Sequence, residues 1–286
     1  MKEIVVLSGK GGTGKTTVLA SFAALAENSV LCDCDVDAPN LHLLLAPRAE
    51  EVHEFYGLQV AHIDSEACNE CGACVDACRF EAIQDFQVDP LACEGCGLCA
   101  RVCPLDAISM HDVLAGHWYV SRTRFGPLVH ARLRAAQENS GKLVMAVRKR
   151  ARELAQQTDA VFILSDGPPG IGCPVISSLS GASMALIVTE PSLSGIHDLE
   201  RVLGLCRHFG VRPLVCINKY DLSEENTRRI EDHCGDAGVE VVGRIPFDPD
   251  VNSAIVQGRP VVEMSDGAAS REIRTLWEAI ATCPVP

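Results

Sequence analysis

The chain has 286 residues, of which 47% are hydrophobic and 22% charged, and its formal net charge is −13 at pH 7. This length suffices for one substantial core and a smaller unit, and no stretch approaches the ~20 apolar residues that cross a bilayer. The acidic balance argues against nucleic acid as a partner, and without an export signal we expect a cytoplasmic protein with reduced thiols.

Short apolar segments alternate with helical patterns along most of the chain. This alternation predicts an α/β fold with a doubly wound, mostly parallel sheet. The expected strands lie near 3–8, 29–34, 160–165, 184–189, 213–217 and 240–245. A cysteine-rich segment interrupts the alternation, so we expect one domain from 1–59 and 113–286, and a small inserted domain at 60–112.

The first expected strand is followed by a glycine-rich loop, Gly9–Thr16, with the pattern G-x4-G-K-[ST] of a P-loop. Backbone amides in such a loop meet phosphates, Lys15 neutralises the β and γ groups, and the Thr16 hydroxyl binds magnesium. The loop therefore predicts a site for ATP or ADP with Mg²⁺. Its expected binding residues are Gly11, Gly12, Thr13, Gly14, Lys15, Thr16 and Thr17.

Lys10 is an additional lysine directly after the first glycine of the loop. With it, the run K-G-G-T-G-K-T-T resembles the deviant Walker A of MinD and ParA-type ATPases. The resemblance implies a P-loop NTPase fold and a slow ATPase that forms a homodimer on ATP binding and is stimulated by the dimer or a partner. It assigns catalytic roles to Lys10, which reaches the partner's phosphates, and to Lys15. A solvated loop lysine is the alternative for Lys10.

Two acidic segments follow in the order that this family has. The segment 33–41 is similar to its switch I, which assigns to Asp37 the catalytic role of positioning the attacking water. The apolar run 160–164 ends in S-D-G-P-P-G, similar to a Walker B strand with switch II. Asp166 is then expected to bind magnesium directly or through water.

The segment 218–221, N-K-Y-D, resembles the family's adenine-reading sequence. The resemblance makes Asn218 the base contact, and the segment 245–248 with Pro246 is expected to close the same pocket. Alternatively, Asn218 merely ends a strand and Asp221 caps the next helix.

Eight cysteines form two copies of C-x2-C-x2-C-x3-C, the second followed by Pro104. This run resembles that of bacterial dicluster ferredoxins, in which the fourth cysteine of each run binds the other cluster. The resemblance implies an α+β module with two [4Fe-4S] clusters in a 25-residue repeat, although Arg79 stands at the position of the first proline. One cluster would be held by Cys68, Cys71, Cys74 and Cys103, and the other by Cys93, Cys96, Cys99 and Cys78.

Zinc and disulfides are the alternatives for these cysteines. Zinc sites usually combine two C-x2-C pairs, whereas here four cysteines form one tight run. Disulfides would require export from the reducing cytoplasm.

Charge is distributed unevenly around the inserted segment. Residues 61–112 carry ten acidic side chains against two arginines, whereas 113–152 carry nine basic side chains against one glutamate. The acidic segment favours a basic redox protein as partner, with a related ATPase subunit as another candidate. The basic stretch predicts a helix capped by Ser140. Its expected buried residues are Leu143, Val144, Val147, Ala151 and Leu154, and its expected solvated cations are Lys142, Arg148, Lys149, Arg150 and Arg152. Docking of the acidic segment and contact with DNA are the alternatives for these cations.

Two further features have alternatives. The C-terminal pattern of Ile273, Leu276, Trp277 and Ile280 favours a helix that packs on the core over a membrane anchor. Cys173 follows Asp166 by seven residues. We expect it to be a small packed side chain, and the alternative is a redox-sensitive thiol at a dimer face.

Together these features predict an ATP-binding iron-sulfur protein in which nucleotide state is coupled to electron transfer or redox sensing. Two alternatives are an ATPase that carries or assembles iron-sulfur clusters, and a MinD- or ParA-like positioning or regulatory ATPase with a redox sensor.

Overall fold

A computed structural model describes residues 1–134 and 140–284, with only the backbone of Leu58 and Ser140. The chain divides into two compact units. Unit 1 comprises Met1–His53, Trp118–Arg132 and Ser140–Pro286, and unit 2 comprises Glu54–His117 and Leu133–Asn139. Two long strands, β3 (Arg48–Ile63) and β6 (Ile108–Thr123), run from one unit into the other.

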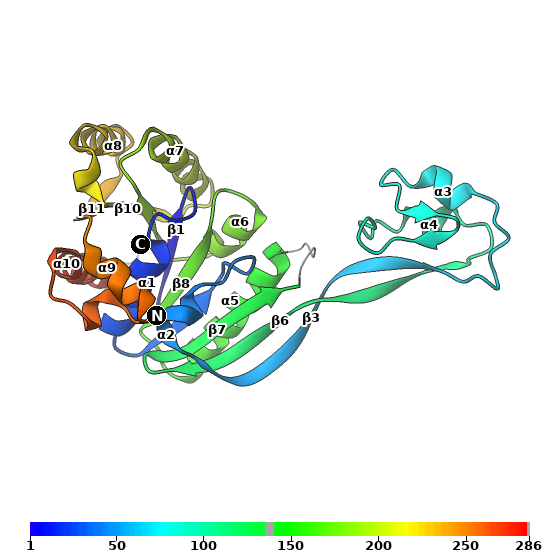
Figure 1. The fold of residues 1–286 in the computed structure, drawn as a ribbon, viewed down its shortest axis with the longest axis horizontal. Coiled ribbons are helices and arrows are strands. Elements are labelled where there is room, and N and C mark those ends of the chain that lie inside the picture. The colour runs from blue at the N-terminus through cyan, green and yellow to red at the C-terminus, as the bar shows by residue number, and fades with distance from the viewer. Residues whose placement is uncertain (135–139, 285–286) are drawn as a thin grey trace. The chain divides into compact units, whose positions relative to one another are not determined.

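Unit 1 is built on a sheet with the strand order β11-β10-β9-β1-β8-β2-β7-β6-β3 (Figure 1). The pairs from β11 to β7 are parallel. The remaining strands are β1 (Lys2–Ser8), β2 (Ser29–Asp33), β7 (Gly126–Leu133), β8 (Phe162–Pro169), β9 (Met184–Thr189), β10 (Arg212–Asn218) and β11 (Glu240–Ile245). The α/β P-loop fold with a mostly parallel central sheet is therefore confirmed.

Helices cover both faces of this sheet, and alternate residues of β1 serve the two sides. Ile4 and Val6 join the core formed with α1 (Lys15–Leu25), α2 (Leu41–Leu45), α9 (Pro249–Val256) and α10 (Ala268–Thr282). Val5 and Leu7 join the core formed with α6 (Cys173–Leu179), α7 (Leu193–His208) and α8 (Glu224–Asp236). The helix α5 (Ser140–Gln157) packs on β2 and α6.

The C-terminal helix packs on the core, as its sequence pattern predicts. Its apolar residues Ile273, Leu276, Trp277 and Ile280 are all buried. The Trp277 ring lies 5.2 Å from the ring of Phe22 and 5.1 Å from that of Phe162. Among the described helices, none is long and apolar enough to cross a membrane.

Three strands of the sheet are absent from the sequence prediction: β3, β6 and β7. Polar and apolar side chains are mixed along β3 and β6 without a continuous apolar run, and many residues of these two strands are exposed. The continuous apolar runs of the central parallel strands, which are buried on both faces, give a clearer pattern. The sequence therefore predicts the interior of the sheet better than its edge.

Unit 2 contains two short helices, α3 (Ala73–Ala77) and α4 (Leu98–Val102), and a small hairpin of β4 (Ile83–Gln84) and β5 (Gln87–Val88). The two helices begin 25 positions apart, as the expected repeat requires. Left-handed backbone recurs at the same spacing, in the pairs Glu70 and Gly95, Gly72 and Gly97, and Glu81 and Asp106. The unit is therefore a structural duplication.

Candidate functional site

The glycine-rich loop lies between β1 and α1, where the first helix turn points its free amides at the carboxyl edge of the sheet. Gly14 adopts left-handed backbone with φ 93°, and a Cβ there would lie 2.4 Å from the Asn218 amide nitrogen. That nitrogen donates a hydrogen bond of 2.8 Å to the Thr13 carbonyl. Glycine is therefore required at position 14 both by backbone angle and by space.

Lys15 is buried between two carboxylates. Its Nζ lies 3.3 Å from Asp35 and 3.6 Å from Asp166. Burial opposes the charge of the amine, but the Asp166 and Asp35 carboxylates outweigh it and raise the pKa of Lys15. Lys15 therefore remains a cation, ready to meet phosphate oxygens. Asp35 is not among the residues predicted for the site, although it lies in the same acidic segment as Asp37.

Asp166 lies beneath the glycine-rich loop and is almost fully buried. Its Oδ2 accepts a hydrogen bond of 2.6 Å from the Thr16 hydroxyl. Its Oδ1 is buried and has no hydrogen-bond partner within the described part of the chain, and neither does the Thr13 hydroxyl. Burial raises the pKa of Asp166 and, with repulsion from Asp166, raises that of Asp33 well above its usual range. A cation beside a hydroxyl and an unsatisfied carboxylate oxygen would relieve this cost, so the residues fit Mg²⁺.

A cavity of about 710 Å³ opens above the loop, large enough for a nucleotide. It brings together most of the expected residues: Gly11, Gly12, Gly14, Lys15, Thr16, Thr17, Asp37 and Asn218. Four expected residues do not line it, namely Lys10, Thr13, Asp166 and Pro246. Ile245 lines the cavity in place of Pro246.

Part of the cavity wall comes from residues that the sequence analysis missed. Val251, Asn252 and Ile255 of α9 and Ile273 of α10 line it. The α9 helix is positioned by its N-cap Asp248, whose side chain accepts from the Asp250 amide at 3.0 Å. The sequence feature that could have predicted this helix is Asp248, a residue type that often caps helix N-termini, shortly after Pro246.

Asp221 joins the loop after β10 to the loop after β11. Its Oδ1 accepts a hydrogen bond of 2.7 Å from the Phe247 amide, so it does more than cap a helix. The cap of α8 is Ser223, whose side chain accepts from the Asn226 amide. Asp221 therefore positions one side of the cavity without lining it.

Lys10 and Asp37 both lie at the edge of the site. Lys10 Nζ is 3.6 Å from Glu190 and lies within 3.4 Å of the hydroxyls of Ser192 and Ser194. It is therefore not simply a solvated lysine. Asp37 is exposed in the loop after β2, and burial of part of its carboxylate, with repulsion from Asp35, raises its pKa.

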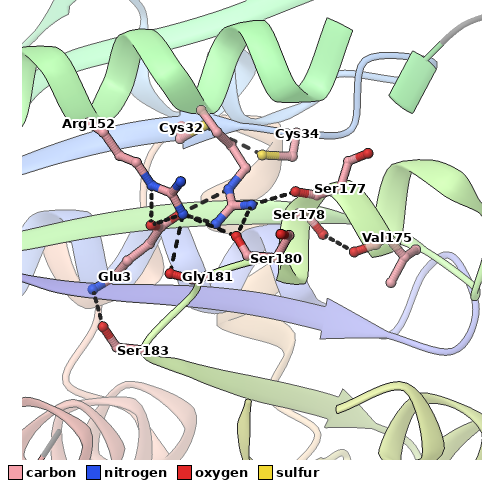
Figure 2. A network of polar contacts seen from close by, with 11 residues as sticks. Glu3, Cys32, Cys34, Arg152, Val175, Ser177, Ser178, Ser180, Gly181 and Ser183 are labelled. Atoms are coloured by element: carbon pink, nitrogen blue, oxygen red, sulfur yellow. Dashed lines mark hydrogen bonds and ion pairs between the residues drawn. The ribbon is translucent and has the colours of Figure 1, made fainter. Parts of the chain in front are cut away.

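The expectation that Arg148 is solvated is wrong. Its side chain is 4% exposed, pairs with Glu3 of β1 and donates to the carbonyls of Ser177 and Ser180 at the end of α6. Figure 2 shows Glu3, Ser177 and Ser180 within this network. Arg152 reaches the same carboxylate from the next helix turn at 2.8 Å. Glu3 is buried, and a buried carboxylate requires such partners.

The rest of α5 follows the prediction in part. Leu143, Val144, Val147 and Ala151 are buried, whereas Leu154 is only partly buried and Ala155 takes the inward position. The helix begins at Ser140, but the expected side-chain cap lies outside the described residues.

The cysteine quartets of unit 2 line two separate cavities. One, of about 330 Å³, is lined by Cys78, Cys93, Cys96 and Cys99, together with Arg79 and Phe80. The other, much smaller at about 10 Å³, is lined by Cys68, Cys71, Cys74 and Cys103. In each cavity three cysteines come from one run and the fourth from the other run.

Across the described ranges, no group of three or more His, Cys, Asp or Glu side chains is arranged to hold a metal ion. Of the cysteines outside unit 2, Cys32, Cys34, Cys206, Cys216 and Cys234 are buried, and Cys283 only partly. Cys173 at the start of α6 is exposed, so the expectation of a packed side chain is wrong.

Residues 4–261 match the model of the CobQ/CobB/MinD/ParA nucleotide binding domain. This P-loop protein belongs to that nucleotide-binding family. The chain is 32% identical over 281 residues to the uncharacterized protein MJ0578 of Methanocaldococcus jannaschii, covering 97% of this chain and 96% of that one. It is 25% identical to the septum site-determining protein MinD of Bacillus subtilis, covering 100% of this chain and 91% of that one.

Solved structures support the same fold. The MinD cell division protein of Aquifex aeolicus superposes with a TM-score of 0.60 at 22% identity, covering 100% of this chain and 99% of that one. MinD of Pyrococcus horikoshii, solved in complex with Mg-ADP, superposes with a TM-score of 0.57 at 21% identity, covering 98% and 96%.

Proposed function

We propose that this protein is a MinD/ParA-type switch ATPase whose second unit senses redox state through two [4Fe-4S] clusters. The ATPase part is carried by one observation: Asp166 is buried under the phosphate loop, with one oxygen hydrogen-bonded to Thr16 and the other 3.6 Å from Lys15 Nζ and without a hydrogen-bond partner among the described residues. Thr16 and Asp166 would hold Mg²⁺, which supplies charge neutralisation for the phosphates when bound. Lys15 adds a second fixed cation.

Hydrolysis in this proposal is slow in the monomer because the catalytic groups are incomplete. Asp37 orients the attacking water by accepting its proton or a hydrogen bond. Lys10 leaves Glu190 and reaches the phosphates of a second copy, so that ATP forms the homodimer. In the single chain Lys10 Nζ lies 3.6 Å from Glu190, so Lys10 has to give up this ion pair when the dimer forms.

Two [4Fe-4S] clusters fit the cysteine cavities of unit 2 by their donor sets, since each cavity gathers four thiols in the interleaved arrangement. Thiolates around a four-iron cluster each bind a different iron, so they stand farther apart than the ligands of one ion. When bound, such clusters supply one-electron redox chemistry. The smaller cavity has to widen on loading.

Cysteine double variants test both the presence of clusters and the pairing. The anaerobically purified protein should contain about eight irons, from two four-iron clusters. Cys68→Ala with Cys103→Ala should remove one cluster and leave about four irons, whereas Cys68→Ala with Cys78→Ala should remove both. The reverse pattern would overturn the interleaved pairing, and wild-type protein that binds zinc without sulfide would overturn the clusters.

The regulatory role is favoured by the family. Its MinD relatives are named for septum site determination, and one was solved with MinC as the MinC:MinD cell division protein complex. By analogy, the ATP-bound dimer of this protein would bind a target protein and the redox state of unit 2 would tune that binding. Sedimentation with ATP and with ADP tests the dimer, and equal mass in both states would contradict it.

Electron transfer gated by ATP is the second candidate. Cys71 and Cys96, one from each quartet, are exposed, so both proposed clusters have a solvent-facing ligand through which a basic redox protein could exchange electrons. Reduction of the clusters by a basic donor protein, faster with ATP than with ADP, would favour this candidate. Equal rates with both nucleotides would favour the sensor.

A further inference from the structure

A second cavity in unit 1 lies beside the nucleotide cavity and has no role in the function proposed above. It measures about 420 Å³, within the range of roughly 300–1,000 Å³ typical of small-molecule sites. One wall is the loop 37–40 after β2. The other walls are formed by His42 of α2, Tyr119 of β6, and His130 and Arg132 of β7.

The two cavities share a wall. Asp37, Ala38 and Asn40 line both the nucleotide cavity and this second one. Asp37 is the residue that we propose to orient the attacking water. A molecule bound in the second cavity would therefore contact the same loop as the nucleotide does.

Arg132 supplies an available cation. It is exposed, lines the cavity, and has no ion-pair partner among the residues that the structure describes. Burial, and then the charge of Arg132, lowers the pKa of His42, which lines the same cavity. Asp37 is the only carboxylate among the described residues that line this cavity. A single cation facing one carboxylate suits a monoanion better than a phosphate dianion, which Asp37 would repel more strongly.

The imidazoles of the cavity are neutral near pH 7. Burial, together with repulsion from His42, lowers the pKa of His130 to about 4. The Nε2 of His130 lies 2.9 Å from the Ser121 hydroxyl, which fixes the ring. Neutral imidazoles add polar contacts without adding charge.

Three rings of the cavity lining form a stack. The ring centroids of Tyr119 and His130 are 5.0 Å apart at an interplanar angle of 20°, and those of His130 and His42 are 6.4 Å apart at 12°. A planar ligand can extend such a stack of near-parallel rings, and aromatic contacts of this kind add to simple burial.

We propose that this cavity binds a small planar monocarboxylate, with its carboxylate on Arg132 and its plane packed against the ring stack. Binding orders the loop 37–40 and so changes the affinity of the neighbouring cavity for nucleotide. By thermodynamic reciprocity, nucleotide changes the affinity for the carboxylate by the same factor.

The test uses 4-fluorobenzoate as the probe in ¹⁹F NMR of the full chain saturated with ADP and Mg²⁺, so that the phosphate loop is occupied. We expect saturable broadening of the probe resonance. Arg132→Gln should weaken binding about tenfold, or about 1.4 kcal/mol. Arg122→Gln is the matched control: Arg122 also lies on this sheet, but it is exposed, pairs with Glu50 and does not line the cavity.

Cyclohexanecarboxylate, which has the same charge and a similar size but is not planar, should displace the probe at least about tenfold less well than unlabelled benzoate. Absence of broadening, or equal affinity of wild type and Arg132→Gln, would overturn the site. Equal displacement by the two carboxylates would overturn its preference for planar ligands. Thermal unfolding of both arginine variants verifies that they fold, which the exposure of both side chains leads us to expect.

Discussion

Replacing Arg148 with methionine tests whether the buried ion pair with Glu3 holds α6 in place. Methionine keeps an apolar stem but leaves the Ser177 and Ser180 carbonyls without this donor, and leaves Glu3 with Arg152 alone. Removing one partner of a buried pair costs about 3–5 kcal/mol, and the remaining Arg152 favours the lower end. For a domain of this size, a loss of about 3 kcal/mol lowers the unfolding midpoint by roughly 6–12 °C.

Arg152→Met is the matched control, because it removes a cation from the same carboxylate. Arg152 is 37% exposed, against 4% for Arg148, so its loss should cost only about 1 kcal/mol, or roughly 2–4 °C. Thermal unfolding followed by circular dichroism at pH 7 measures both. Equal midpoints for the two variants would refute the argument that burial gives Arg148 its weight.

Three more predictions concern single side chains. Thr16→Val removes the hydroxyl that donates a hydrogen bond to Asp166. The factor by which Mg²⁺ increases ATP affinity should therefore fall about tenfold in titrations with a fluorescent ATP analogue, and an unchanged factor would contradict the magnesium site. Asp37→Ala should slow phosphate release about 100-fold or more with ATP binding retained, and a wild-type rate would exclude Asp37 as the water-positioning group. Folding lowers the pKa of His130 from 6.5 to about 4, so as pH falls the unfolded chain binds a proton at this residue before the folded chain does. The free energy of unfolding should therefore decline as pH falls from about 6.5 to about 4. His130→Gln should weaken this decline in thermal unfolding at pH 7 and 5, and an identical decline would refute its cause.

The central strands and the phosphate loop could be predicted from sequence because local pattern determines them. Continuous apolar runs mark strands buried on both faces, and the loop pattern specifies backbone angles such as that of Gly14. The 25-residue repeat of unit 2 was visible for the same reason, since each half repeats its own turns.

Contacts between distant segments were not predictable. Arg148 is one of several cations in its stretch, and only the fold brings Glu3, 145 positions away, beside it. Likewise, the sequence does not distinguish the roles of Asp35 and Asp37. In the structure, the bend after β2 turns Asp35 toward Lys15 and leaves Asp37 exposed. The residues of α9 that line the nucleotide cavity carry no sequence signal beyond the Asp248 cap.

In the function that we propose, nucleotide binding in unit 1 and the redox state of the clusters held by the cysteine quartets of unit 2 affect one another. The most direct measurement is a potentiometric titration of the anaerobic protein, followed by EPR, with and without ATP and Mg²⁺. We expect EPR signals of reduced [4Fe-4S] clusters and a midpoint potential that shifts by about 120 mV with nucleotide if reduction changes ATP affinity about 100-fold. Absence of cluster signals, or the same potential with and without nucleotide, would contradict it.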